Sequence, residues 1–204
     1  MAEVLVIARS EFILGGQRSG KSRRAEMLAR QWLAASDKHR AVLIATGQPG
    51  DDEMAQRIAR HKADRAERVP GMTTVEEPLA LAEAIALNSR PGTLVVVDCL
   101  TLWLTNLLMP AEPSSAVSEP FSVSNESPAH YLCAGAAMLL VAIENAAGPV
   151  IFVGNEIGLG VIPMGRETRA FVDELGRLNQ DVAAACQRVT LMVAGLPLYL
   201  KGAP

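Results

Sequence analysis

The most informative stretch of the chain reads Gly15-Gly16-Gln17-Arg18-Ser19-Gly20-Lys21-Ser22. A short apolar run at residues 12–14 precedes it, and a helical pattern over residues 23–33 follows it. Two glycines that bracket four residues let a loop curl so that its N–H groups point at phosphate oxygens, with Lys21 reaching the β- and γ-phosphates and Ser22 holding Mg²⁺. The alternative is a glycine-rich turn that carries Lys-Ser by coincidence. The strand before the stretch and the helix after it favour a phosphate-binding loop.

Composition places the chain among single-domain globular proteins. Its 204 residues are 50% hydrophobic and carry a formal net charge of -3, so we expect one α/β domain over residues 1–204 and no nucleic-acid partner. The three cysteines are odd in number and lack metal-type spacing, which argues against a disulfide framework and a zinc site. No secretory signal or membrane-spanning run is found, so the expected location is the cytoplasm, without membrane insertion.

Apolar runs alternate with helical patterns along the whole chain. This alternation predicts a P-loop NTPase-type α/β fold, in which a mainly parallel sheet is covered by helices on both faces. Residues 1–11 are expected to form an N-terminal extension, and the Ser- and Pro-rich residues 110–128 a mobile surface loop. The expected strands after the first are residues 41–45, 73–77, 93–98, 149–154, 189–194 and 198–200, and the expected later helices are residues 51–68, 78–88, 100–109, 129–146 and 166–188.

Two further features carry chemistry. The apolar strand at residues 93–98 ends in Asp98, the form of the second acidic residue in phosphate-loop proteins, which holds Mg²⁺ together with Ser22. The alternative is a helix N-cap before residues 100–109. The helix at residues 51–68 repeats cationic side chains at helical spacings around His61, and these could converge on nucleotide phosphates. The alternative for this helix is a solvated surface.

Several motifs together resemble a known family. These are the phosphate loop, Ala45-Thr46, Asp51-Asp52-Glu53-Met54-Ala55, Arg57-Ile58-x-x-His61, Thr74-Val75-Glu76-Glu77-Pro78, Asp98-Cys99-Leu100-Thr101, Thr105-Asn106-Leu107-Leu108 and Asn155-Glu156-Ile157-Gly158. In this order they resemble the bifunctional adenosylcobinamide kinase / adenosylcobinamide-phosphate guanylyltransferase family of cobalamin biosynthesis. The resemblance covers nearly the whole chain from residue 12. Met72 departs from it, because many relatives have an aromatic residue there.

The resemblance implies two reactions on one nucleotide site. ATP or GTP phosphorylates the corrinoid adenosylcobinamide, and GMP then passes from GTP through a histidine to adenosylcobinamide phosphate. His61 is the implied nucleophile, the cofactor is Mg²⁺, and the family forms trimers, which implies a homo-oligomer. The residues implied to contact the nucleotide are Gly15, Gly16, Gln17, Arg18, Ser19, Gly20, Lys21, Ser22, Thr46, Gly47, Gln48, Lys62, Ala63, Asp64, Arg65, Glu76 and Asp98.

Two rival functions stay open from the sequence. One is a phosphate-loop kinase of small molecules that forms no covalent enzyme intermediate. The other is a nucleotide-dependent switch or motor subunit, which would carry a guanine-reading motif of the Asn-Lys-x-Asp kind that this chain lacks. The preferred phosphoryl donor and the corrinoid-binding residues are also open. Within the resemblance the kinase half is the less secure, because some relatives act mainly as the transferase.

Overall fold

The computed structural model describes residues 6–109, 128–161 and 163–203. Within them one seven-stranded sheet runs in the order β3-β2-β4-β5-β1-β6-β7, and every pair is parallel except β6 with β7. The strands are β1 (Ser10–Gly15), β2 (Arg40–Ala45), β3 (Met72–Glu76), β4 (Thr93–Asp98), β5 (Val150–Val153), β6 (Arg188–Val193) and β7 (Leu196–Lys201). The predicted mainly parallel sheet is confirmed.

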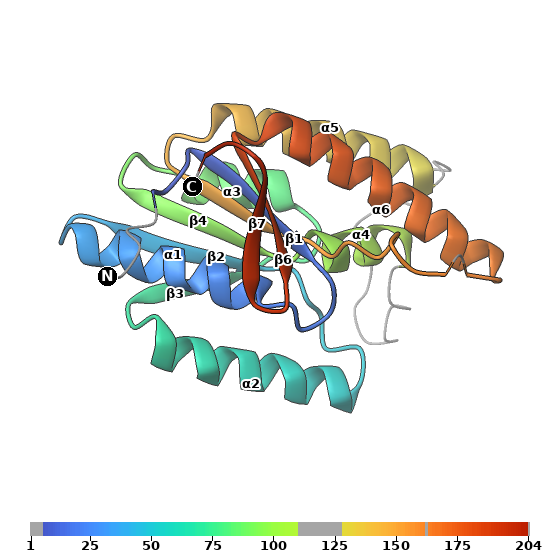
Figure 1. The fold of residues 1–204 in the computed structure, drawn as a ribbon, viewed down its shortest axis with the longest axis horizontal. Coiled ribbons are helices and arrows are strands. Elements are labelled where there is room, and N and C mark those ends of the chain that lie inside the picture. Colours follow the sequence, from blue (N-terminus) through green and yellow to red (C-terminus); the bar gives the residue numbers. More distant parts are fainter. Residues whose placement is uncertain (1–5, 110–127, 162, 204) are drawn as a thin grey trace, which may run out of the picture.

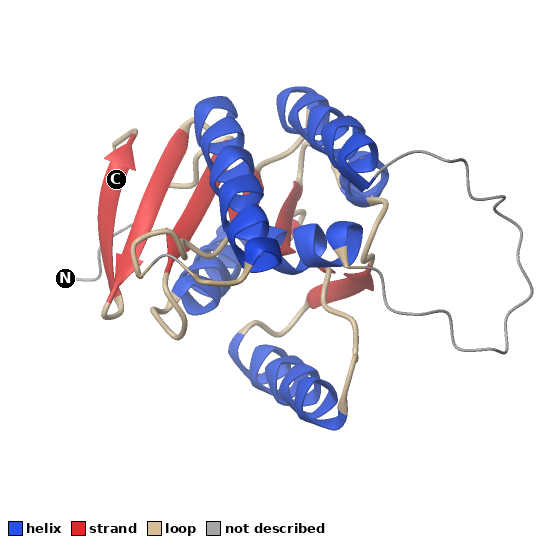
Figure 2. Ribbon diagram, turned by 90° about the vertical axis from the view of Figure 1, so that its right-hand side faces the viewer, coloured by secondary structure: helices blue, strands red, loops and turns tan. Residues whose placement is uncertain are grey.

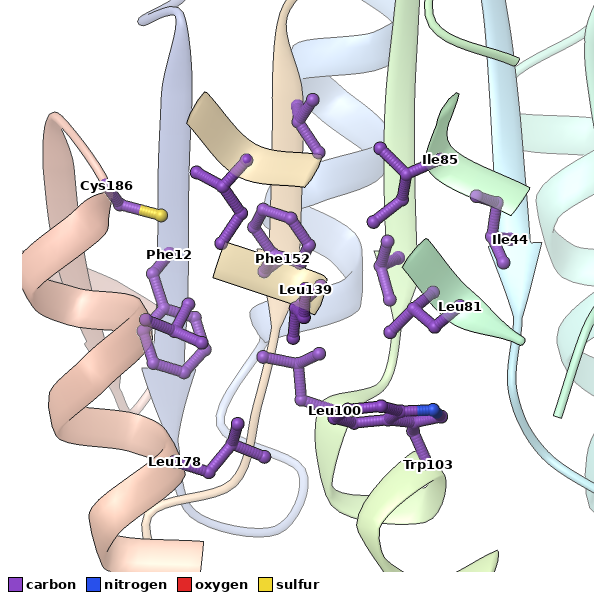
Figure 3. Close-up of a cluster of buried hydrophobic side chains, with 14 of the residues drawn as sticks. Phe12, Ile44, Leu81, Ile85, Leu100, Trp103, Leu139, Phe152, Leu178 and Cys186 are labelled. Carbon is purple, nitrogen blue, oxygen red and sulfur yellow. The ribbon is translucent and has the colours of Figure 1, made fainter. Parts of the chain in front are cut away.

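Helices cover both faces of this sheet (Figure 1). They are α1 (Lys21–Ala35), α2 (Asp52–Arg68), α3 (Leu81–Asn88), α4 (Leu100–Leu108), α5 (Pro128–Asn145) and α6 (Arg166–Ala185). One core cluster packs α1 against the sheet, with Leu28 against strand residues such as Ile13 and Ile151. The other cluster joins α3, α4, α5 and α6 to the opposite face, and Figure 3 shows Phe12 and Phe152 within it.

The periodicity of the sequence explains the elements. All β4 residues before Asp98 are buried, as expected of an apolar strand that is covered on both faces. In α6 the buried residues Leu175, Leu178 and Val182 recur every three or four positions, so one stripe of the helix faces the core. Among the described helices, none combines the length and the hydropathy that crossing a lipid bilayer requires.

Some predicted boundaries were wrong. β1 begins at Ser10, so the N-terminal extension is shorter than residues 1–11, and Glu11 is buried in the sheet beside Arg188. α3 begins at Leu81 rather than at residue 78, because the Glu77 carboxylate accepts hydrogen bonds from the N–H groups of residues 79 and 80 and holds a turn there. The predicted mobile loop at residues 110–128 lies outside the described residues apart from Pro128, where α5 begins.

The topology positions a ligand site beside β1. The chain leaves β1 through α1 on one face of the sheet, whereas it leaves the neighbouring β5 through α6 on the other face. In open parallel sheets such a switch point opens a crevice at the carboxyl ends of the strands, where ligands bind. The phosphate loop follows β1 directly, so it lies at this crevice.

Candidate active site

The predicted site residues gather at the carboxyl edge of the sheet. The phosphate loop follows β1, Thr46 follows β2, Glu76 ends β3 and Asp98 ends β4. Because these strands are parallel, their carboxyl ends lie along one edge. The structure therefore brings together residues that are up to 83 positions apart in the sequence, between Gly15 and Asp98.

Close packing and a main-chain hydrogen bond hold the phosphate loop in place. A Cβ at Gly15 would lie 2.5 Å from both the Met192 carbonyl oxygen and the Ser19 Oγ, so only glycine fits. Gly20, the N-cap of α1, has a φ of 100°, a left-handed conformation that favours glycine. From the turn between β6 and β7, the Gly195 N–H donates to the Ser19 carbonyl at 3.0 Å. These contacts hold the loop against the sheet and the hairpin.

Lys21 is the buried cation of the loop. Its Nζ donates to the Gly16 carbonyl oxygen at 2.6 Å. Burial lowers the pKa of Lys21, Arg57 on α2 lowers it further, and Cys99 and Asp98 act in the opposite direction without offsetting the burial. A cation whose pKa is lowered in this way gains from an added anion nearby. The loop is therefore electrostatically suited to phosphate.

Asp98 is half-buried at the end of β4. The N-cap of α4 is Cys99 rather than Asp98, and no side chain caps that helix, so the alternative role of Asp98 as a helix cap is wrong. Cys99 itself is no candidate nucleophile, because burial, followed by the neighbouring Asp98 charge, raises the pKa of its thiol to about 12. This leaves the Asp98 carboxylate available for a metal or for substrate.

Thr46 is fully buried, and its hydroxyl is occupied by the protein. The hydroxyl donates to the Cys99 carbonyl at 2.7 Å and accepts from the Cys99 N–H at 2.9 Å. The Asn106 amide donates to the Thr46 carbonyl at 2.7 Å. Thr46 thus ties the end of β2 to the residue after Asp98, and a direct contact with the nucleotide stays a prediction.

Other polar side chains position the site without having been assigned roles from the sequence. The Thr101 hydroxyl accepts from the Asn155 N–H at 2.9 Å, and the Asn179 amide donates to the Asn155 carbonyl at 3.1 Å. Both fix the loop after β5. Thr101 and Asn155 stood within the motifs that carry the family resemblance, whereas Asn179 reaches the loop from the middle of α6 and gave no signal in the sequence.

His61 lies on α2, which is set off from the other helices at the lower edge of the molecule (Figures 1 and 2). The imidazole is exposed, and it shares a helix face with Ile58 and Arg65. Ile58 lies toward the loop after β2, since a Cβ at Gly47 would be 3.9 Å from its Cδ1, and buried Arg65 donates to the Thr74 hydroxyl at 3.4 Å. His61 therefore belongs to the face of α2 that is turned toward the sheet.

The other residues predicted to contact the nucleotide on and near α2 differ in where the structure places them. Lys62 forms an ion pair with Glu76 at the end of β3, so both lie at the sheet edge. Gln48 and Ala63 are exposed. Asp64 instead pairs with Arg68 at 2.9 Å. The only buried residue of α2 is Arg65, so much of this helix is a solvated surface, as the alternative interpretation expected. Its contacts with a ligand stay predictions.

Comparison with known proteins adds an independent finding. The family described as cobinamide kinase / cobinamide phosphate guanyltransferase matches residues 11–200. The chain belongs to this family. Cobinamide kinase / guanyltransferase relatives include the bifunctional adenosylcobalamin biosynthesis protein CobP of Pseudomonas aeruginosa, with 46% identity over 95% of this chain and 98% of the relative. The protein CobU of Escherichia coli, with the same description, is 35% identical over 93% of this chain and 98% of its own.

Membership in the cobinamide kinase / guanyltransferase family confirms the resemblance and places the chain among enzymes, against the switch or motor alternative.

A solved structure, the flagellar accessory protein FlaH of Methanocaldococcus jannaschii, aligns with a TM-score of 0.49 at 10% identity, covering 97% of this chain and 80% of FlaH. The fold is assigned here from the strand order and the phosphate loop.

Proposed function

We propose that the chain phosphorylates adenosylcobinamide with ATP or GTP and then transfers GMP from GTP to adenosylcobinamide phosphate, giving adenosyl-GDP-cobinamide. The observation that carries this proposal is the carboxyl edge of the sheet, where the phosphate loop follows β1, Asp98 ends β4, and the loop after β2 leads into α2, which bears His61. The family match over residues 11–200 supports it. The corrinoid substrate follows from the names of the family and of its relatives.

In the first reaction, the aminopropanol hydroxyl of adenosylcobinamide attacks the γ-phosphorus. The new O–P bond forms as the bond to the β-phosphate oxygen breaks, the nucleoside diphosphate leaves, and the hydroxyl loses its proton. Lys21 and the loop N–H groups offset the charge that develops on the phosphate oxygens. Burial lowers the pKa of Lys21, so an anion bound beside the ammonium group would stabilise its charged form.

In the second reaction, a ring nitrogen of His61 attacks the α-phosphorus of GTP. A P–N bond forms and pyrophosphate leaves; then a phosphate oxygen of the corrinoid attacks the same phosphorus and the P–N bond breaks. Two observations support His61. Its imidazole is exposed, and two cationic residues, Lys62 and Arg65, follow it on the same helix, with Glu76 and Thr74 as their partners in this structure.

A magnesium ion fits the donors present. Mg²⁺ in phosphoryl-transfer sites is held by one or two carboxylates together with substrate phosphates, rather than by a full cage of protein ligands. Asp98 supplies a half-buried carboxylate beside Lys21, and Ser22 supplies a hydroxyl in the first turn of α1. When bound, the ion would neutralise charge on the phosphate oxygens.

The remaining predicted residues complete the proposal. Gly15 to Ser22 bind the nucleotide phosphates, and Gly47, Gln48, Lys62 and Glu76 contact GTP on the α2 side. We also propose a homotrimer, on the family resemblance alone, and light scattering on the purified protein tests it.

The product test is direct. Purified protein receives adenosylcobinamide with ATP and Mg²⁺, and then GTP, and mass spectrometry follows the corrinoid. The proposal expects a gain of one phosphate, followed by a gain of GMP with release of pyrophosphate. Conversion of adenosylcobinamide phosphate but not of adenosylcobinamide would refute the kinase reaction and support only the GMP-transfer reaction. Conversion of neither corrinoid would refute the function.

A further inference from the structure

A second hollow adjoins the phosphate loop on its β6 side. It is a cavity of about 420 Å³, within the size range of small-molecule sites. The loop residues 16–19 form one wall, Leu159, Leu191 and Val193 form apolar walls, and Glu156 adds a carboxylate. Leu159 is 81% exposed and Val193 is 55% exposed, so both present apolar surface that the fold leaves uncovered.

This cavity lies across the loop from the transferase residues. In the sheet, β5, β4, β2 and β3 extend from one side of β1, whereas β6 and β7 extend from the other. Asp98, Glu76 and the α2 helix with His61 belong to the first side. The cavity is lined by residues 191–194 of β6 and its turn and by the loop after β5, and neither Asp98, Glu76 nor His61 lines it.

The two proposed reactions require the purine base of the nucleotide to bind at two different positions. Phosphoryl transfer brings the γ-phosphorus of the nucleotide to the acceptor end of the corrinoid, whereas GMP transfer brings the α-phosphorus to His61 and then to the same end of the corrinoid. The γ-phosphorus and the base are at opposite ends of a nucleoside triphosphate. Asp98 is a proposed ligand of the Mg²⁺ that binds the transferred phosphate, and β4 and β6 lie on opposite sides of β1, so a γ-phosphate directed to Asp98 leaves the purine base on the β6 side of the loop.

We propose that the cavity holds the purine base of the nucleotide that donates the γ-phosphoryl group, so that the loop binds nucleotides in two opposite orientations. This inference rests on the proposed function. The apolar walls offer surfaces on which the faces of a purine can pack. The Glu156 carboxylate accepts from the Gly158 N–H at 3.1 Å and from the Asn179 amide at 3.5 Å, and an ionised carboxylate keeps further lone pairs for an exocyclic amino group.

The cavity walls are fixed to the loop that binds the phosphates. The Glu156 N–H donates to the Gly15 carbonyl at 3.2 Å. Ala194 and Gly195 have φ values of 51° and 82°, as a tight two-residue turn requires, and Val193 pairs with Leu196 across it. Because the Gly195 N–H of the same turn donates to the Ser19 carbonyl, the cavity wall at Val193 is connected directly to the phosphate loop.

Photo-crosslinking locates the base without relying on turnover. The full chain is irradiated with 8-azido-ATP, with and without excess ATP, and the labelled peptides are mapped by mass spectrometry. We expect ATP-protected label on the peptides that contain Leu159 or residues 191–195. Label confined to α2 and β3 would overturn the inference and leave the proposed function standing. Failure to bind both ATP and GTP, measured by calorimetry, would overturn both the inference and the kinase reaction.

A charge in the wall gives a second test. Val193→Asp should raise the Kd for ATP at least tenfold, and by more than it raises the KM for GTP in GMP transfer. The matched control is Leu198→Asp on β7: Leu198 is also 55% exposed and pairs with Leu191, but it does not line the cavity. Equal changes in the two variants, or an unchanged Kd for ATP in Val193→Asp, would contradict the proposal.

Discussion

The phosphate loop and the α2 helix both follow strands of the sheet at its carboxyl edge, yet they are held in opposite ways. Main-chain hydrogen bonds and the absence of room for a Cβ at Gly15 fix the loop, and Lys21 is buried within it. The α2 helix has one buried residue, Arg65. Its links to the rest of the fold include the surface ion pairs of Lys62 with Glu76 and of Arg68 with Glu26.

This difference separates the two parts of the proposed chemistry. The proposed phosphate site is packed against the core, so that an added Cβ at Gly15 would meet a backbone carbonyl oxygen. The proposed nucleophile, His61, lies on a solvated helix that is held mainly by polar contacts of small energy. Substitutions in the loop should therefore damage both reactions and the stability of the fold, whereas substitutions on α2 should change the reactions and leave the fold intact.

The largest expected effect is that of Lys21→Ala. Removing the buried cation should lower both phosphoryl transfer and GMP transfer by roughly a hundredfold or more, as for the loss of one preorganised charge-stabilising donor. Both rates are measured on the folded variant, with the exposed Lys38→Ala as control. A variant that retained either rate would show that the two reactions do not share this loop.

Removal of a proposed metal ligand should have the next largest effect. Ser22→Ala and Asp98→Asn should each raise the Mg²⁺ concentration that gives half-maximal activity by about tenfold or more. A Mg²⁺ titration of both reactions measures this, and Asp37→Asn serves as the surface control. Superimposable titrations of the wild type and the two variants would remove Ser22 and Asp98 from metal binding.

Gly15→Ala tests how tightly the loop is braced. The added Cβ meets the Met192 carbonyl oxygen and the Ser19 Oγ, so we expect a loss of about 1–3 kcal/mol in the free energy of unfolding. Gly16→Ala is the matched control, because a Cβ there meets nothing within 4 Å. Urea unfolding compares the two variants, and equal stability would mean that the loop is free to shift.

The smallest effect on stability should come from Glu76→Gln, which breaks the ion pair with Lys62. Both side chains are about half exposed, so the unfolding free energy should change by less than about 1 kcal/mol. The KM for GTP in GMP transfer should nevertheless rise. Glu67→Gln, at another exposed carboxylate of α2, is the control for the kinetic effect. A large loss of stability in Glu76→Gln would mean that α2 is part of the core.

Local patterns predicted most of the fold. The strand at β4 was predicted with its observed bounds, because a continuous apolar run ending in Asp98 has few other interpretations in an α/β chain. The end of the N-terminal extension was predicted wrongly, because the first strand was assigned only to the apolar residues 12–14, whereas β1 begins at the polar Ser10. In the structure Glu11 is buried and accepts from Thr190 and Arg188, which are 177 or more positions away.

The site was predictable where a single segment carries it. The spacing of Gly15, Gly20 and Lys21 suffices for a phosphate loop, whereas the support of the loop by Gly195 depends on a hairpin that pairs only in three dimensions. Asn179 likewise reaches the loop after β5 from a helix 24 positions away. Sequence periodicity reports burial within one element and contains no record of such distant partners.

The most direct test of the account is whether GMP becomes bonded to His61. GTP labelled at the α-phosphorus should leave label on the denatured protein, whereas GTP labelled at the γ-phosphorus should not. Acid should release the label, because protonated nitrogen leaves readily, and alkali should not. We predict that His61→Asn abolishes labelling and that the control His39→Asn retains it. Label that persists in His61→Asn would contradict the account by placing the nucleophile on another residue.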